Sequence, residues 1–233
     1  MKTFITFGGG HQNFIDAGER LIEQARKTKY FDKTIFYTEK DLKNDKRFWS
    51  QHSEFILKNK RGYGYWLWKP YIIKKTMSAM RNGDILFYSD CGCEIGGDKQ
   101  LLIPDFFDYV KTDKIIGSNA CTEKYWCKKD LIKYLDINSE EYLNSPQRQS
   151  GASIWLVCRE TISLVNEYYK ICCNYHMIDD SPSIEPNTEG FREHRHDQAV
   201  FSLLTKKLGI YSKKTTENCI YITRNKSKKS KLK

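Results

Sequence analysis

Short apolar runs alternate with amphipathic stretches along most of the chain. Residues 2–7, 34–38 and 84–88 are short and rich in apolar side chains, which favours buried strands. Between the first two runs, apolar residues recur every three or four positions from Phe14 to Ala25, as on one face of a helix. A strand, a helix and a second strand in this order are typical of an α/β domain with a parallel sheet.

The alternation continues as far as residue 223. Further strands are predicted at residues 114–117, 153–157 and 219–223, and further helices at residues 48–57, 70–80, 99–110, 128–135, 160–173 and 197–208. The sequence contains no internal repeat and no long linker. We therefore predict a single α/β domain over residues 1–223, with a mostly parallel central sheet flanked by helices.

The composition fits a folded protein with a basic end. Of the 233 residues, 39% are apolar and 14% are aromatic, which is enough for a hydrophobic core and excludes a wholly disordered chain. The net charge is +10, but residues 224–233 carry six positive charges, so residues 1–223 carry only +4. We predict that residues 224–233 form a disordered, solvated tail, with contact to an anionic surface as its alternative role.

The sequence shows no signal for export or membrane insertion. Its first apolar stretch stops at the glycines Gly8 to Gly10 and is too short for a signal peptide. No stretch approaches the roughly 20 apolar residues of a membrane helix. The eight cysteines form no CxxC pair and no disulfide framework, so we interpret them as free thiols. We expect a cytoplasmic protein.

Asp90 is the strongest candidate for a functional residue. An apolar run that ends in an acid and then glycine places this carboxylate at the carboxyl edge of the sheet, where α/β proteins bind ligands. A carboxylate at that edge can hold Mg²⁺ or Mn²⁺, with Glu94 as a second ligand, and Gly92 lets a phosphate approach the backbone. The alternative is an Asp that only opens a surface turn.

Residues 60–73 combine cations, glycines and aromatic rings. The guanidinium of Arg61 and the ammonium of Lys69 are suited to phosphate oxygens, and the aromatic rings can stack on a base or a sugar. Pro70 is typical of a first helical turn, whose positive end faces anions. The alternative is an aromatic core element with solvated flanks.

Asp197 lies where a helix is predicted to begin, next to His196. In that position it is either the helix cap or a carboxylate that acts on an acceptor hydroxyl as a base or by positioning it. The nearby histidines are a weak metal signal, because no cluster of Cys or His completes a zinc site.

In order and spacing these segments resemble GT-A-fold glycosyltransferases, the nucleotide-diphospho-sugar transferases related to capsular-polysaccharide and viral enzymes. The resemblance runs through the strand that ends at Gly8, the segment RGYGYWLWKP, the strand ending in Tyr-Ser-Asp-x-Gly, the segment Gln-x-Ser-Gly-Ala-Ser, and His-Asp-Gln at a helix start. It implies metal-assisted transfer of a sugar, from a UDP-sugar in preference, to an acceptor hydroxyl in glycan or polysaccharide synthesis.

The resemblance also implies roles for individual residues. Asp90 would be the ligand of Mn²⁺ or Mg²⁺ together with Glu94, and Asp197 would lie near the donor sugar and the acceptor. Residues implied to contact the nucleotide sugar are Thr6, Phe7, Gly8, Tyr37, Arg61, Lys69, Ser89, Gly92, Gln149, Gly151 and His196.

Two departures from the family pattern keep other functions open. Gly92 stands where the second acid of an Asp-x-Asp motif is expected, and no histidine follows Asp197. An inactive relative that binds sugar nucleotides is one alternative. A basic nucleic-acid-binding protein is the other, although the charge of the body without the tail argues against it. The sequence leaves open whether transfer retains or inverts the anomeric configuration.

Overall fold

The computed structural model describes residues 1–137, 139–210 and 212–232, and its centre is one sheet. Within these residues five strands follow the order β2-β1-β3-β5-β4. The strands are β1 (Lys2–Gly8), β2 (Lys33–Thr38), β3 (Ile85–Ser89), β4 (Ile115–Thr122) and β5 (Pro146–Leu156). The predicted α/β class is confirmed.

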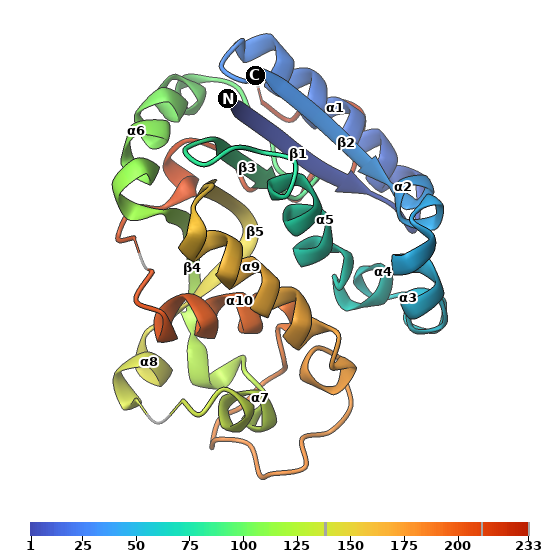
Figure 1. The fold of residues 1–233 in the computed structure, drawn as a ribbon, viewed down its shortest axis with the longest axis vertical. Coiled ribbons are helices and arrows are strands. Elements are labelled where there is room, and N and C mark those ends of the chain that lie inside the picture. The colour runs from blue at the N-terminus through green and yellow to red at the C-terminus, as the bar shows by residue number, and fades with distance from the viewer. Residues whose placement is uncertain (138, 211, 233) are drawn as a thin grey trace.

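The helices lie on both faces of this sheet (Figure 1). The longer ones match the predicted positions: α1 (Gln12–Thr28), α3 (Lys46–Lys58), α5 (Trp68–Met77), α6 (Ile103–Asp113), α9 (Arg159–Cys172) and α10 (His196–Lys207). The short helices are α2 (Glu39–Asn44), α4 (Gly62–Tyr65), α7 (Lys129–Tyr134) and α8 (Glu140–Asn144), with 3₁₀ turns η1 (Asp98–Leu102), η2 (Glu123–Tyr125), η3 (Tyr175–Met177) and η4 (Thr216–Asn218). No helix in the described ranges has both the length and the apolar character needed to cross a bilayer.

The sheet is mostly, but not entirely, parallel. β1 pairs in parallel with β2 and β3, whereas β5 runs antiparallel to both of its neighbours, β3 and β4. The antiparallel direction of β5 decides where the first half of this strand lies. Ser89, at the end of β3, pairs with Ala152 of β5. The part of β5 before residue 152 therefore extends past the carboxyl end of β3, where ligands of α/β sheets bind.

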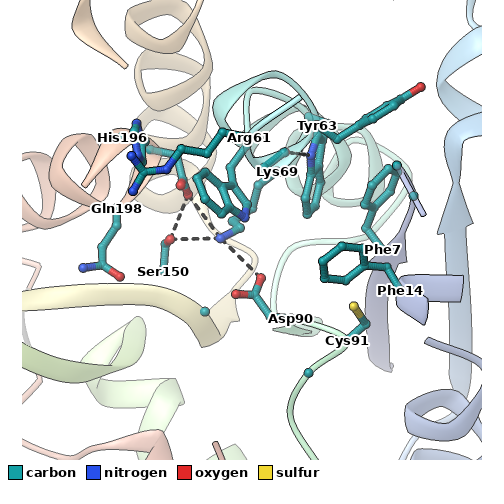
Figure 2. Close-up of a pocket in the computed structure, with 18 of the residues that line it drawn as sticks. Phe7, Phe14, Arg61, Tyr63, Lys69, Asp90, Cys91, Ser150, His196 and Gln198 are labelled. Atoms are coloured by element: carbon teal, nitrogen blue, oxygen red, sulfur yellow. Dashed lines mark hydrogen bonds and ion pairs between the residues drawn. The ribbon is translucent and has the colours of Figure 1, made fainter. Parts of the chain in front are cut away.

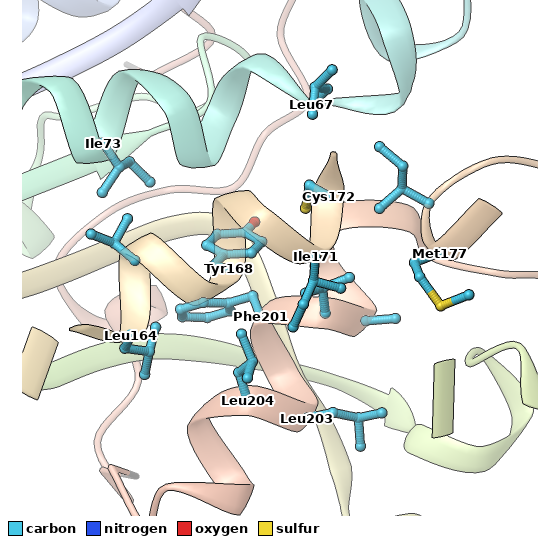
Figure 3. Close-up of a cluster of buried hydrophobic side chains, with 14 of the residues drawn as sticks. Leu67, Ile73, Leu164, Tyr168, Ile171, Cys172, Met177, Phe201, Leu203 and Leu204 are labelled. Carbon is cyan, nitrogen blue, oxygen red and sulfur yellow. The ribbon is translucent and has the colours of Figure 1, made fainter. Parts of the chain in front are cut away.

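Side-chain alternation along the strands divides the core into two layers. Phe4 and Phe87 pack on the face covered by α1 and α6, while Ile5 and Leu86 pack on the face covered by α5, α9 and α10. Figure 3 shows the second layer, in which Tyr168 of α9 lies beside Phe201 of α10. This layer fixes α5, α9 and α10, which carry the polar site described below.

The C-terminal segment differs from both predictions made for it. The strand expected at residues 219–223 is absent, and only a single bridge joins Tyr221 to Glu94. Residues 224–232, expected to be disordered and outside the domain, lie against the body, where Asn225 is 1% exposed. The correction has a physical reason, since buried Arg20 and Glu94 find their polar partners in this segment.

Candidate functional site

A cavity of about 630 Å³ lies at the carboxyl end of the sheet. Its walls come from the ends of β1 and β3, residues 60–69, the first half of β5, the start of α10 and the C-terminal segment. A crevice at this edge is where open α/β sheets place their ligands, because loops from several strands meet there.

Lys69 joins two carboxylates at the floor of the cavity (Figure 2). Its Nζ lies 3.3 Å from Oδ1 of Asp90 and 3.3 Å from Oδ2 of Asp197. It also donates to Oγ of Ser150 at 3.0 Å. The Lys69 side chain is 3% exposed, so its charge depends on these partners and not on water.

Hydroxyl groups hold the two carboxylates in place. Ser150 and Tyr168 each donate to Oδ2 of Asp197 at 2.7 Å, and Tyr88 donates to Oδ1 of Asp90. The Asp197 side chain is 4% exposed, whereas that of Asp90 is 38% exposed. Asp90 is therefore the carboxylate that a molecule in the cavity can reach.

Burial and charge act in opposite directions on these groups. Burial alone would lower the pKa of Lys69, but the charges of Asp197 and Asp90 outweigh it, so the pKa is raised. Loss of hydration raises the pKa of Asp90, opposed in part by Lys69. Lys69 thus stays charged, and Asp90 accepts a proton more readily than an exposed aspartate does.

Aromatic rings form the opposite wall of the cavity. Figure 2 shows Phe7, Phe14 and Tyr63 on the side away from Ser150 and Gln198. Phe7 stacks on Trp68 with ring centroids 3.9 Å apart, which fixes the ring in the wall. Such a wall offers flat apolar faces to a planar ligand.

A left-handed turn at residues 62–66 places the rings of Tyr63 and Trp66 in the wall of the cavity. The φ angles of all five residues in it are positive, between 50° and 85°. Gly62 and Gly64 adopt such angles without strain, and a Cβ on Gly64 would lie only 2.7 Å from Cγ1 of Ile56. The two glycines of the segment are therefore needed for the turn. His196 stacks on Trp66, the last residue of the turn, with ring centroids 5.2 Å apart.

Cations outnumber acids among the described residues that line the cavity. Six side chains are cationic and two are carboxylates: Lys60, Arg61, Lys69, Arg195, Arg224 and Lys226 against Asp90 and Asp197. Arg61 is paired with Asp180 at 3.1 Å and with Glu193 at 3.2 Å. Within the part of the chain that the structure describes, Arg224 and Lys226 form no ion pair with a carboxylate.

The structure brings nine of the predicted site residues to the cavity. They are Phe7, Arg61, Lys69, Asp90, Gly92, Gln149, Gly151, His196 and Asp197. Gly151 allows a close approach, because a Cβ there would lie 3.0 Å from Oδ2 of Asp90. Their predicted contacts with a nucleotide sugar remain predictions.

Four residues predicted to contact the nucleotide do not line the cavity. Thr6 alternates with Phe7 along β1 and is fully buried, as is Ser89. A Cβ on Gly8 would lie 2.4 Å from the carbonyl oxygen of Phe14, so the glycine serves packing. The Tyr37 hydroxyl lies 3.0 Å from that of Thr76. The placement of these residues does not support the predicted contacts.

The residues present do not fit the expected divalent metal. Glu94 is fully buried and is absent from the lining of the cavity, and its carboxylate accepts from Thr223, Ser230 and the backbone N–H of Lys231. Lys69 occupies the position between Asp90 and Asp197. In the described ranges no group of three or more His, Cys, Asp or Glu side chains is placed to hold a metal.

Sequence reasoning missed several residues of the site, among them Tyr168, Arg224 and Lys226. Tyr168 follows the apolar pattern of its helix, and only its bond to Asp197 reveals a polar role. Arg224 and Lys226 were interpreted as part of a solvated charge run. A signal for them was the single Asn225 within the run, because a buried amide can anchor the residues on either side.

Comparison with known proteins finds similarity to solved structures at low sequence identity. No family model and no curated protein matches the sequence. The chain is similar to apo mouse xyloside xylosyltransferase 1, with a TM-score of 0.46 and 9% identity over 90% of this chain and 83% of the other. It is also similar to apo WbbM, a bifunctional glycosyltransferase, with a TM-score of 0.47 and 11% identity over 91% of this chain and 38% of the other.

Proposed function

We propose that this protein is a glycosyltransferase that moves a sugar from a nucleotide-diphosphate sugar, with UDP-sugars favoured, to a hydroxyl group of an acceptor. One observation carries the proposal: a charged cluster of Asp90, Lys69 and Asp197 lies at the floor of a cavity at the carboxyl edge of the sheet. The three side chains come from three separate segments, and their convergence serves no hydrophobic packing.

The two ends of the cavity suit the two ends of such a donor. In the aromatic wall, the half-buried rings of Phe14 and Tyr63 offer faces for a nucleobase. The carboxylate of Asp90, which a molecule in the cavity can reach, can accept hydrogen bonds from sugar hydroxyls. The cations that line the rest of the cavity suit a diphosphate. They would stabilise its negative charge, which increases when the sugar leaves.

The proposed reaction needs one proton acceptor. The bond between the anomeric carbon and the diphosphate oxygen breaks, and its electron pair leaves with the nucleoside diphosphate. The acceptor oxygen bonds to the anomeric carbon and loses its proton to a carboxylate. Asp90 is the better candidate for this proton, because its side chain is 38% exposed and its pKa is raised. The buried Asp197 then positions Lys69.

Binding without transfer is the second candidate function. It is favoured by the pairing of Lys69 with both carboxylates, which leaves them fewer free oxygen lone pairs for chemistry. A nucleotide sugar would then stabilise the protein and remain intact.

Release of free nucleoside diphosphate from a panel of UDP- and GDP-sugars, with and without sugar acceptors, tests the proposal. We expect release by the natural protein and a loss of about 100-fold or more in Asp90→Asn, since a positioned acid or base contributes about that much. Asp108→Asn is the matched control, because Asp108 is 73% exposed and pairs with Lys111 on the surface. Failure of every nucleotide sugar both to react and to raise the melting temperature would refute the proposal.

A further inference from the structure

A divalent ion has no place between the carboxylates of this site. Protein-bound Mg²⁺ and Ca²⁺ take oxygen ligands at about 2.0–2.6 Å. Oδ1 of Asp90 and Oδ2 of Asp197 instead converge on Nζ of Lys69, at 3.3 Å each. The Lys69 residue is 2% exposed, so a metal ion could enter only if this buried side chain moved out.

The position of a second acid ligand is also taken. A Cβ on Gly92 would lie 3.4 Å from Cα of Arg224 and 3.8 Å from the backbone N of Asn225. A methyl group fits at that distance, but a carboxylate beyond it would meet the backbone of the C-terminal segment. That backbone is bound to the same glycine, because Asn225 N–H donates to the Gly92 carbonyl at 2.8 Å.

Two buried charges anchor the C-terminal segment beside the site. The guanidinium of Arg20 donates to the carbonyls of Asn225 and Ser227 and, on its other side, to those of Cys91 and Cys93. Fully buried Glu94 accepts from Ser230 at 2.7 Å and from Lys231 N–H at 2.8 Å. Because an unpaired buried charge is unfavourable, these bonds hold residues 225–231 across the loop that follows Asp90.

The anchored segment directs two cations into the cavity. Asn225 is 1% exposed, and the residues on either side of it, Arg224 and Lys226, both line the cavity. Nζ of Lys226 lies 5.0 Å from the centroid of the Phe14 ring, in the aromatic wall. Neither side chain is neutralised by a carboxylate within the described ranges, so both remain available to an anion.

On the basis of the proposed function, we propose that the protein's own cations hold the donor diphosphate without a divalent metal. Arg224 and Lys226 contact the phosphate oxygens, and Lys69 supplies the positive charge at the carboxylates. A guanidinium and an ammonium bind phosphate through charge-assisted hydrogen bonds, and they also stabilise the charge on the departing nucleoside diphosphate. The C-terminal segment is thus a part of the donor site.

Titration calorimetry with UDP on the full chain tests this, in buffer with EDTA and in buffer with Mn²⁺. We expect the same dissociation constant in both buffers. Arg224→Gln with Lys226→Gln should weaken UDP binding by at least about 10-fold, the range expected for lost hydrogen bonds to charged groups. Lys228→Gln with Lys231→Gln is the matched control. It removes the same charge from the same segment, outside the cavity, and should change the constant less than about 2-fold.

Three other outcomes contradict the inference. UDP binding that requires Mn²⁺ would overturn it while leaving the proposed function intact. Equal losses in the two double variants would show that only general charge attraction is at work. A melting temperature for the Arg224 and Lys226 variant equal to that of the natural protein shows that the segment is still folded. Absence of UDP and GDP binding in both buffers would overturn the inference together with the proposed function.

Discussion

At the scale of single residues, the site centres on a buried lysine, Lys69. An ammonium group removed from water is stable only if opposite charges and hydrogen-bond acceptors replace the lost hydration. Lys69 has both, in Asp90, Asp197 and the Ser150 hydroxyl. Its removal would leave two carboxylates close together without a cation, so we expect the fold to be sensitive to substitution at this position.

Replacement of Lys69 by Met should lower the free energy of unfolding by about 3–5 kcal/mol, the usual cost of removing one partner of a buried ion pair. Lys75→Met is the matched control from the same helix. Lys75 pairs with Asp45 at 2.8 Å but is 42% exposed, so its loss should cost less than about 1 kcal/mol. Urea denaturation measures both values. Similar losses in the two variants would contradict the view that Lys69 belongs to a buried ion pair.

At the scale of elements, His52 ties α3 to the layer that carries the site. Its Nδ1 lies 2.8 Å from the Tyr175 hydroxyl of η3, and its Nε2 lies 2.8 Å from the Tyr169 hydroxyl of α9. Burial of the ring lowers the pKa of His52 from 6.5 to about 4. The folded protein therefore keeps this ring neutral at pH values where the unfolded chain protonates it.

This difference predicts a loss of stability in mild acid. Between about pH 6.5 and pH 4 the unfolded chain binds the extra proton, so the free energy of unfolding decreases as the pH falls through that window. At 1.36 kcal/mol for each pKa unit, His52 accounts for roughly 3 kcal/mol. His52→Gln should flatten the dependence but not abolish it, because burial also lowers the pKa of His194 to about 3. Urea denaturation at a series of pH values checks this, and an unchanged slope would contradict it.

The sequence predicted the site residues that stand at the ends of elements. Asp90 follows a buried strand, Asp197 begins a helix, and Lys69 precedes the proline of another helix. Each has a local signal in its position, although helix caps and turns also favour polar residues at such boundaries. Thr6 and Tyr37 also stand near strand ends, but the alternation and packing of their strands turn them away from the cavity.

At the scale of the whole molecule, the parts that the sequence did not predict depend on distant partners. β5 is buried along much of its length, and such a pattern does not specify whether a strand runs parallel or antiparallel. The C-terminal lysines look solvated until Arg20 and Glu94, far away in the chain, are seen to bind the backbone between them. Both features shape the site, because one places Ser150 and the other places Arg224 and Lys226.

A crystal structure of the protein with a bound, unreactive UDP-sugar analogue is the most direct test of the central claim. We predict the uracil ring on the aromatic wall beside Phe14 and Tyr63, the diphosphate near Arg224 and Lys226, and the sugar against Asp90. A nucleotide bound outside this cavity, or one whose sugar lies away from Asp90, would contradict the account.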